Sequence, residues 1–338
     1  MIRRYSNKTD WRLLRAVTED SLNASGRFPG PVSVDGKIEW IDSGRYHDNY
    51  RFWISAPGLP VEWQGKPLLL RLGTQKRPAR SKSNTAHYLM REARTLEALQ
   101  DAAFGFETPE LISIVKSDAR QPIGLIENWV WGMSLHDYRE GRYADTIIST
   151  IAAVAAAVHR LPADRFSHLP AFPDSRSHIL HELKSMPPAL FREYPAAQAV
   201  RRWILSRLPA RRPAAVLHGD LLPQNIHGGE NRGEWKVAVI DWEFAEIGDP
   251  ALDLAIVTRG DRRFMGKNDA LRHLVDTYRA AGGSEITVAD VHVHELLLCL
   301  KWLWSSSQRH RRGLTEGHGP DHHAQRVDSL LRRAQKAA

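Results

Sequence analysis

Short apolar segments and one strongly amphipathic segment alternate through the first 130 or so residues. Residues 84–101 carry an apolar stripe at helical spacing, formed by Leu89, Ala93, Leu96 and Leu99, which predicts a helix with one buried face. Residues 10–23 predict an earlier helix. Five apolar segments predict strands: 37–43, 50–56, 68–72, 111–115 and 123–127. Three strands, a helix and two more strands indicate an antiparallel sheet that carries one helix.

Helical periodicity dominates the chain after residue 128. Residues 145–161 are apolar on most sides, which predicts a buried central helix. Asp249 followed by Pro250 is a helix start signal. Further helices are expected at 175–186, 195–208, 266–281, 287–308 and 322–336. The pattern predicts an α+β fold with two domains, an N-terminal sheet lobe at 1–127 and a larger, mainly helical lobe at 128–338.

Composition agrees with a two-lobed globular protein. The chain has 338 residues, of which 42% are hydrophobic and 25% charged. No apolar run reaches the length of a membrane span, and the N-terminus lacks the apolar core of a signal peptide. The single cysteine, Cys299, lies among leucines and predicts a buried, unreactive thiol. A cytoplasmic protein is therefore expected, with no membrane association.

The net charge of +8 raises the question of a nucleic-acid partner. The basic residues are dispersed, and the densest groups are Arg309–Arg312 and Arg332–Arg333. Charge runs of this kind usually form a solvated surface, so we expect no nucleic acid and no obligate protein partner.

The strongest chemical signal lies in the segment from Val216 to Glu243. Asp220 and Asn225 are separated by four residues, and Asp241 follows the strand-like run 235–240. This spacing is typical of a kinase catalytic loop and its metal site. A carboxylate at Asp220 would orient the attacking hydroxyl and accept its proton. Oxygen atoms of Asn225 and Asp241 would bind Mg²⁺, which prefers such ligands. His218, just before Asp220, is interpreted as a structural residue that braces the loop.

Candidate nucleotide contacts precede this motif. Arg71 stands among apolar residues of the third predicted strand, where a kinase fold supplies the cation for the ATP phosphates. Guanidinium can bind phosphate in a bidentate manner, and the alternative is that Arg71 faces solvent. Glu92 lies on or beside the apolar stripe of 84–101 and is the natural partner of Arg71, with Glu97 as its rival.

Two connecting segments complete the predicted nucleotide site. The turn from Ser43 and Gly44 to Asn49 could wrap the phosphates with backbone amides, although an ordinary hairpin turn would have the same composition. Glu127 to Trp129 joins the two predicted lobes, and this connector could offer backbone groups to adenine. A plain linker is the alternative reading.

Taken together, these residues resemble the aminoglycoside phosphotransferase and choline kinase-like family, which has the protein-kinase-like fold. The resemblance covers about residues 37–260 and is carried by Leu217–Asp220, Ile240–Glu243 and Gly248–Ala255. It implies ATP and Mg²⁺ as cofactors, Asp220 as the base, and Asn225 and Asp241 as metal ligands. It also implies that Arg71, in place of the usual Lys, contacts phosphate beside Glu92, and that Asp253 braces the catalytic loop.

A small-molecule alcohol is the expected substrate. Gly219 stands where many protein kinases carry the Arg that pairs with a phosphorylated activation loop. Only seven residues, from Trp242 to Gly248, separate Asp241 from the next helix start, which leaves no room for a peptide-docking segment. The family name places an aminoglycoside first, and Glu246, Asp261 and Glu295 could attract such a cation. A choline-like amino alcohol, a sugar, a macrolide or another metabolite is an alternative. A pseudokinase regulator that only binds nucleotide is the alternative of another class.

Overall fold

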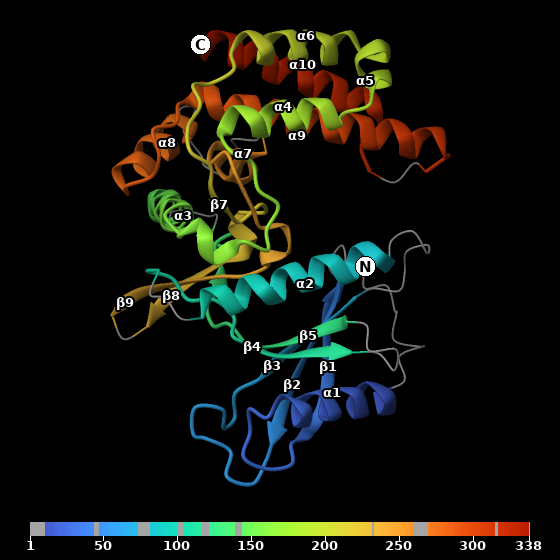
Figure 1. Ribbon diagram of the computed structural model, residues 1–338, viewed down its shortest axis with the longest axis vertical. Helices are drawn as coiled ribbons and strands as arrows, with labels where there is room; N and C mark the ends of the chain where they lie inside the picture. The colour runs from blue at the N-terminus through green and yellow to red at the C-terminus, as the bar shows by residue number, and fades with distance from the viewer. Residues whose placement is uncertain are drawn as a thin grey trace. The chain divides into compact units, whose positions relative to one another are not determined.

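The computed structural model describes residues 11–43, 47–73, 82–100, 104–116, 122–138, 144–231, 233–259, 270–314 and 317–337. The chain forms two compact units (Figure 1). Unit 1 consists of Met1–Ala102, Glu107–Trp131 and Ala238–Phe244, and unit 2 consists of Ala103–Phe106, Gly132–Val237 and Ala245–Ala338. The segment Ala238–Phe244, which the sequence pattern assigned to the second lobe, groups with unit 1. The reason is that Ala238 bridges to Glu107 and the N–H of Val239 donates to the Glu107 carbonyl at 2.9 Å.

Unit 1 is built on a five-stranded antiparallel sheet in the order β1-β2-β3-β5-β4. Its strands are β1 (Ser33–Ser43), β2 (His47–Ser55), β3 (Leu68–Gly73), β4 (Leu111–Lys116) and β5 (Pro122–Asn128). All five were expected from the sequence, although β1 and β2 begin earlier than the hydrophobic pattern indicated. In this register Arg71 of β3 lies opposite Asn49 of β2 and Leu125 of β5.

Two helices cover the sheet of unit 1. Helix α1 (Trp11–Ser25) packs on β4 and β1, and α2 (Lys82–Leu99) packs on β5, β4 and β3 (Figure 1). Leu125 and Ile126 are adjacent on β5 and both fully buried, which is possible because neighbouring strand residues point to opposite faces. The sheet is therefore covered on both faces, and the stripe on α2 is buried as its spacing predicted.

Unit 2 is mainly helical, with short strands around one loop. Its helices are α3 (Ala144–His159), α4 (Ser175–Ser185), α5 (Pro188–Glu193), α6 (Pro195–Ser206), α7 (Ala251–Thr258), α8 (Ala270–Ala280), α9 (Val288–Arg311) and α10 (Pro320–Ala337). Strands β7 (Ala215–Leu217) and β10 (Glu246–Gly248) pair with each other, and β6 (Met133–Ser134), β8 (Ile226–Asn231) and β9 (Glu234–Val239) form a second small sheet. The sequence predicted short strands around the catalytic motifs but assigned only 235–240 by residue number, and the short helix α5 was not expected.

Helix α9 is the central element of unit 2. Residues along one side of it, including Leu296, Leu300 and Leu303, are buried in a core shared with α4, α6 and α10. Cys299 lies in the same core, and burial raises the pKa of its thiol to about 12, which confirms the expected unreactive cysteine. Thr287 begins α9 with a capping box, in which its hydroxyl accepts from the Asp290 N–H while the Asp290 carboxylate accepts from the Thr287 N–H.

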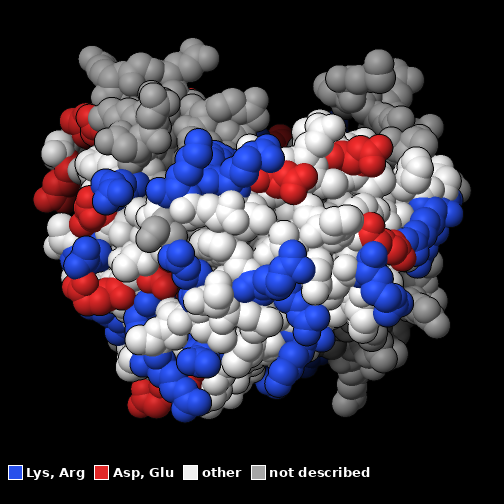
Figure 2. All heavy atoms as spheres, turned by 90° about the horizontal axis from the view of Figure 1, so that it is seen from above, with Lys and Arg blue, Asp and Glu red and all other residues white. Residues whose placement is uncertain are grey.

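Basic side chains are spread over the outer face of the C-terminal helices. Figure 2 looks onto the part of the molecule that carries α5, α6 and α10, where Lys and Arg side chains outnumber Asp and Glu. Arg311 and Arg312 at the end of α9 and Arg332 on α10 are exposed, as a solvated basic face requires. Within the described ranges, none of the helices is both long and apolar enough to cross a lipid bilayer.

Candidate active site

The segment from His218 to Asn225 forms a tight loop between β7 and a short 3-10 helix, η3 (Pro223–Asn225). Gly219 has a φ of 77°, which a glycine adopts without the steric cost that a side chain would add. The Asp220 N–H donates to Nδ1 of His218 at 3.2 Å, and His218 is fully buried. His218 is thus a structural residue of the loop, as its position beside Asp220 predicted.

Asn225 is folded back onto Asp220. Its side-chain nitrogen Nδ2 donates to the Asp220 backbone carbonyl at 2.8 Å and lies 3.2 Å from Oδ2 of the Asp220 carboxylate. The amide nitrogen of Asn225 is turned toward Asp220, so its oxygen Oδ1 is the atom suited to a cation. Guanidinium nitrogen Nη2 of Arg259 lies 3.2 Å from the other Asp220 oxygen, Oδ1.

Asp253, on α7, fixes the backbone of this loop. Its Oδ2 accepts from the His218 N–H at 2.8 Å and its Oδ1 from the Gly219 N–H at 2.9 Å. The carboxylate is fully buried. Burial by itself raises the pKa of Asp253, but a hydrogen bond from His159 and electrostatic interactions with His159 and His218 lower it below the usual value. Asp253 therefore stays ionised, with the contacts expected of a residue that braces the catalytic loop.

A buried chain of hydrogen bonds continues from Asp253 and was not predicted. His159 Nε2 donates to Asp253 Oδ2 at 3.1 Å, and His159 Nδ1 lies 2.8 Å from the Tyr278 hydroxyl. The Tyr278 oxygen accepts from the Ser284 N–H at 3.0 Å. His159 ends α3 and Tyr278 lies on α8, so residues far apart in the sequence hold one carboxylate.

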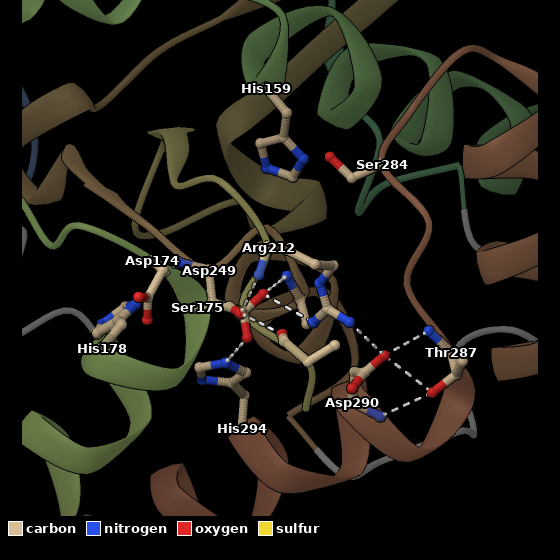
Figure 3. A network of polar contacts seen from close by, with 12 residues as sticks. His159, Asp174, Ser175, His178, Arg212, Asp249, Ser284, Thr287, Asp290 and His294 are labelled. Carbon is tan, nitrogen blue, oxygen red and sulfur yellow. Dashed lines mark hydrogen bonds and ion pairs between the residues drawn. The ribbon is translucent and has the colours of Figure 1, made fainter. Parts of the chain in front are cut away.

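A second polar network holds the segment that begins α7, as Figure 3 shows. Arg212 lies between Asp249, with Nη2–Oδ1 at 3.3 Å, and Asp290, with Nη1–Oδ2 at 2.9 Å. His294 donates to the other Asp249 oxygen at 3.0 Å. Burial raises the pKa of Asp249, but the His294 hydrogen bond and the Arg212 charge outweigh it and keep the pKa below its usual value. The carboxylate stays charged within unit 2.

Gly248 precedes Asp249 because no side chain fits there. A Cβ at this position would lie 2.4 Å from Nδ1 of His178, the atom that accepts a hydrogen bond from the Asp249 N–H at 3.0 Å. The Gly-Asp pair that helped to identify the motif is therefore explained by packing against His178 and by the charge network, since Asp249 also accepts from the N–H of Ala251.

In unit 1, Arg71 is the centre of a buried ionic cluster. Nη1 of Arg71 donates to Oε1 of Glu92, and Nη2 lies 2.7 Å from Oδ1 of Asp241. The predicted pairing of Arg71 with Glu92 is confirmed, whereas the rival Glu97 is exposed. Burial alone would lower the pKa of Arg71, but the carboxylates of Glu92 and Asp241 raise it, so the guanidinium remains charged. The alternative that Arg71 faces solvent is wrong.

This pairing depends on arginine. One guanidinium reaches two carboxylates through two different nitrogens, whereas a lysine ammonium is a single point charge. Arg71 also has Nη2 3.5 Å from Nδ1 of His47. Its η nitrogens already bind carboxylates in this structure, so contact with a phosphate requires an exchange of partners. The role of Arg71 in phosphate binding stays a prediction.

Asp241 has an unusual backbone conformation, with a φ of 71°. A positive φ is costly for a residue with a side chain and is often found at functional sites. The next residue, Trp242, is fully buried, and its N–H donates to Oε1 of Glu92 at 3.2 Å. Arg71 of β3 thus holds the Asp241 side chain, and Glu92 of α2 holds the peptide that follows it.

His47 and Glu243 also belong to the cluster and were missed as site residues. Nδ1 of His47 lies 3.4 Å from Oε2 of Glu243, and both side chains are buried. Burial, aided by the nearby Arg71 charge, lowers the pKa of His47 to about 3, so the ring is neutral at physiological pH. The only sequence signal was position, since His47 lies within the predicted phosphate turn and Glu243 comes two residues after Asp241.

Glu127 and Trp129 lie at the end of β5 and beyond it. The Trp129 N–H donates to the Pro67 carbonyl at 3.3 Å, and the Asn128 N–H donates to the Glu110 carbonyl at 3.1 Å. Two backbone donors of the connector are therefore taken within unit 1, and contacts of Glu127 and Trp129 with a nucleotide stay predictions. The Glu127 side chain is buried beside Arg71, and Oε1 has no hydrogen-bond partner among the described residues.

Burial of Glu127 predicts a pH-dependent stability. Desolvation raises the pKa of its carboxyl from 4.5 to about 7, although Arg71 lowers it. The folded protein therefore binds this proton more tightly than the unfolded chain does. The stabilisation is complete below about pH 4.5 and is lost as the pH rises to about 7. The free energy of unfolding of Glu127→Gln, relative to that of the wild type, should therefore rise by up to about 3 kcal/mol between pH 4.5 and pH 8.

Urea unfolding of both proteins at these two pH values measures that difference. Comparing variant with wild type removes the opposing contribution of His47, whose depressed pKa makes the folded state less stable as the pH falls from 6.5 toward 3. A difference in unfolding free energy that does not change with pH would show that folding does not raise the pKa of Glu127.

The remaining predicted residues are placed differently or lie outside the described part. Ser43 ends β1, where it pairs with Asp48, and Gly44 and Asp261 lie outside the described residues. Glu295 is fully buried and bonded to Thr258 and His292, so the expectation that it attracts a cationic substrate is wrong. Glu246 lies 3.3 Å from Nε2 of His178.

The donor set for a metal ion is hard and oxygen-rich, as Mg²⁺ requires. Asn225 Oδ1 in unit 2 and the Asp241 carboxylate in unit 1 are chemically suited to it. Among the residues that the structure describes, no three His, Cys, Asp or Glu side chains are grouped so as to hold a metal ion. The role of Asn225 and Asp241 as Mg²⁺ ligands stays a prediction.

Comparisons with known proteins agree on one family and one fold. The sequence model of the APH phosphotransferase enzyme family matches residues 37–292. Acyl-CoA dehydrogenase family member 10 of Mus musculus is 25% identical over 211 residues, which are 60% of this chain and 19% of the mouse protein. The chain thus spans only a small part of the length of that curated relative.

Solved structures of antibiotic phosphotransferases share the fold at low sequence identity. A macrolide 2'-phosphotransferase type I has a TM-score of 0.62 at 16% identity and covers 95% of this chain and 96% of its own. The GDP and kanamycin complex of APH(2")-IIia has a TM-score of 0.60 at 16% identity, with 90% and 93% covered. A ternary complex of the aminoglycoside phosphotransferase APH(4)-Ia with AMP-PNP and hygromycin B has a TM-score of 0.58 at 16% identity, with 90% and 96% covered. The expected kinase-like α+β fold is confirmed.

Proposed function

Because this chain belongs to the APH phosphotransferase enzyme family, as its motifs predicted, we propose that it transfers the γ-phosphoryl group of ATP to the hydroxyl of a small molecule. The observation that carries the proposal is the Asp220 loop. A carboxylate is held on a backbone braced by Asp253 and is oriented by Asn225. A partly exposed carboxylate fixed in this way can orient a hydroxyl and accept its proton.

The division of tasks follows the chemistry of each side chain. Asp220 positions the acceptor hydroxyl and takes its proton as the oxygen attacks phosphorus, while the bond from phosphorus to the ADP oxygen breaks. Asn225 and Asp241 would supply oxygen ligands to Mg²⁺, and the bound ion would neutralise phosphate charge. Arg71, held by Glu92, supplies a fixed positive charge to the nucleotide site in unit 1.

The nucleotides and antibiotics bound in similar structures support a small-molecule phosphotransferase but do not identify the acceptor of this chain. Those proteins were solved with GDP or AMP-PNP and with kanamycin or hygromycin B. A sequence identity of 16% shows a shared fold and not a shared substrate, so the acceptor of this chain has to be found by experiment.

A coupled ADP-release screen tests the function. The protein should release ADP in an acceptor-dependent manner from ATP and Mg²⁺ with at least one member of a library of aminoglycosides, macrolides, amino alcohols, sugars and hydroxy acids. Removing Mg²⁺ with EDTA should abolish release, and adding Mg²⁺ back should restore it. Nucleotide binding without release for any acceptor would contradict the proposal and favour a nucleotide-binding regulator.

A further inference from the structure

Arg259 ends α7 in a strained backbone conformation. Its φ is 45° and its ψ is 30°, in the left-handed region, and its N–H donates to the Ala255 carbonyl at 2.7 Å. Glycine is the usual residue at such a helix end, and the next residue in the sequence is Gly260. Aside from Asp241, Arg259 is the only non-glycine residue with a positive φ in the described part of the chain. An arginine at a position that favours glycine suggests a task for its side chain, because a positive φ costs energy that another interaction has to offset.

The guanidinium of Arg259 is aimed at the proposed base. Nη2 of Arg259 lies 3.2 Å from Oδ1 of Asp220, while the amide of Asn225 lies beside Oδ2. The two ends of the carboxylate therefore have different partners. Of the two, Asn225 has a second bond that fixes it, to the Asp220 carbonyl. The partner of Oδ1 is a long side chain that stays about half exposed, at 46%, and can move.

The backbone of Arg259 is held in place from the C-terminal helices. Nη2 of Arg326, on α10, donates to the Arg259 carbonyl, and the Arg326 guanidinium lies 4.9 Å from the centre of the Trp302 ring on α9. Arg259 is thus fixed at its backbone by α7, α9 and α10 while its side chain reaches the catalytic loop. This arrangement presents one permanent positive charge at the exposed edge of Asp220.

A cationic acceptor is a poor match for this edge. Its amino groups would approach a protonated guanidinium in the site where its hydroxyl has to meet Asp220. Of the three acidic residues that the sequence offered for a cationic acceptor, Glu295 is buried and bonded, Glu246 lies beside His178, and Asp261 lies outside the described residues. An acceptor that brings its own negative charge would be attracted by the same geometry.

We propose that Arg259 is an acceptor-binding residue, and that the substrate is an alcohol bearing a carboxylate or phosphate group near the reacting hydroxyl. This inference rests on the function proposed above. The guanidinium fork binds either oxyanion in a bidentate manner. When the acceptor anion takes Arg259, the contact of its guanidinium with Oδ1 of Asp220 is exchanged for a contact with the acceptor. Acceptor binding and this exchange are then one event.

A charge-matched set of sugars tests the inference. Glucuronate and glucose 6-phosphate carry a carboxylate and a phosphate, glucose is neutral, and glucosamine is cationic. Each is titrated against the full-length protein with the non-hydrolysable nucleotide AMP-PNP and Mg²⁺, and binding is followed by ligand-detected NMR. At least one anionic sugar should bind roughly tenfold to hundredfold more tightly than glucose, and glucosamine should bind most weakly. The better of the two anionic sugars distinguishes carboxylate from phosphate.

Variants of Arg259 assign the preference to this side chain. Arg259→Gly keeps the left-handed backbone and the carbonyl that Arg326 uses, and should remove the anionic preference. Arg259→Lys keeps the charge and should retain part of the preference for anionic sugars. Arg279→Gln is the matched control, because Arg279 is a comparably exposed arginine, at 44%, that pairs with Glu285 at 2.5 Å on α8 and its following turn. The control should bind as the wild type does.

Each other outcome overturns the inference. If neither anionic sugar binds, if glucosamine binds as well as they do, or if Arg259→Gly keeps the preference, Arg259 does not select an anionic acceptor. With any acceptor from the ADP-release screen, an equal loss of turnover for anionic and neutral acceptors in Arg259→Gly would place Arg259 on the phosphoryl side instead. The proposed function is judged separately, by acceptor-dependent ADP release in the wild type, so the two can fail independently.

Discussion

Replacing Asp220 with asparagine is expected to reduce turnover by roughly two to four orders of magnitude while nucleotide binding is kept. The amide has nearly the shape of the carboxylate and can still accept a hydrogen bond from Asn225 or Arg259. It cannot take a proton from the acceptor hydroxyl at neutral pH. The variant therefore separates proton transfer from the architecture of the loop.

The measurements are steady-state ADP release with the best acceptor from the screen and calorimetric titration with ATP and Mg²⁺. Asp276→Asn serves as the control, because Asp276 is an exposed aspartate on α8 of the same unit. It should leave both quantities unchanged. Near-normal turnover in Asp220→Asn would refute the role of Asp220 as base, since the loop geometry is preserved in this variant.

Replacing Asp253 with alanine is expected to lower the free energy of unfolding by about 3–5 kcal/mol. The carboxylate is fully buried and accepts from the backbone N–H groups of His218 and Gly219. It also accepts from His159 Nε2. Alanine would leave these donors in the interior without an acceptor, and each such group carries its own desolvation penalty.

Asp253→Asn should lower the free energy of unfolding by less than Asp253→Ala, but still clearly. One of the two carboxylate oxygens becomes an NH₂ group, which faces a hydrogen-bond donor. Chemical denaturation followed by tryptophan fluorescence measures the loss. Asp328→Ala on α10 is the control, since Asp328 is exposed, and it should remain within about 0.5 kcal/mol of the wild type. A loss below about 1 kcal/mol in Asp253→Ala would mean that water or a rearranged loop satisfies the donors.

Several residues of the candidate site were beyond reach of the sequence pattern. His47 and Glu243 join the Arg71 cluster although the chain separates them widely, and neither residue type at its position indicates the other as a partner. His159 and Tyr278 support Asp253 from α3 and α8, and both lie in helices whose periodicity indicates only burial. Arg259 follows an apolar helix end that gives no sign of an ion pair with Asp220. Their common feature is a contact between elements distant in sequence, which hydrophobic spacing does not encode.

Local interactions made the elements predictable. The stripe on residues 84–101 has only one way to bury its leucines, and the Asp220, Asn225 and Asp241 spacing is set by the chemistry of one short loop and the strand after it. The sequence by itself therefore determined the helices, most of the strands, the kinase-like fold class and the family. Partner choice among charges was decided by the tertiary structure. Only in the folded unit does Arg71 contact both Glu92 and Asp241. Likewise, only the end of α7 places Arg259 beside Asp220. A buried charge is stabilised by whichever opposite charge the packing places within a few ångströms, and that distance is a property of the whole fold.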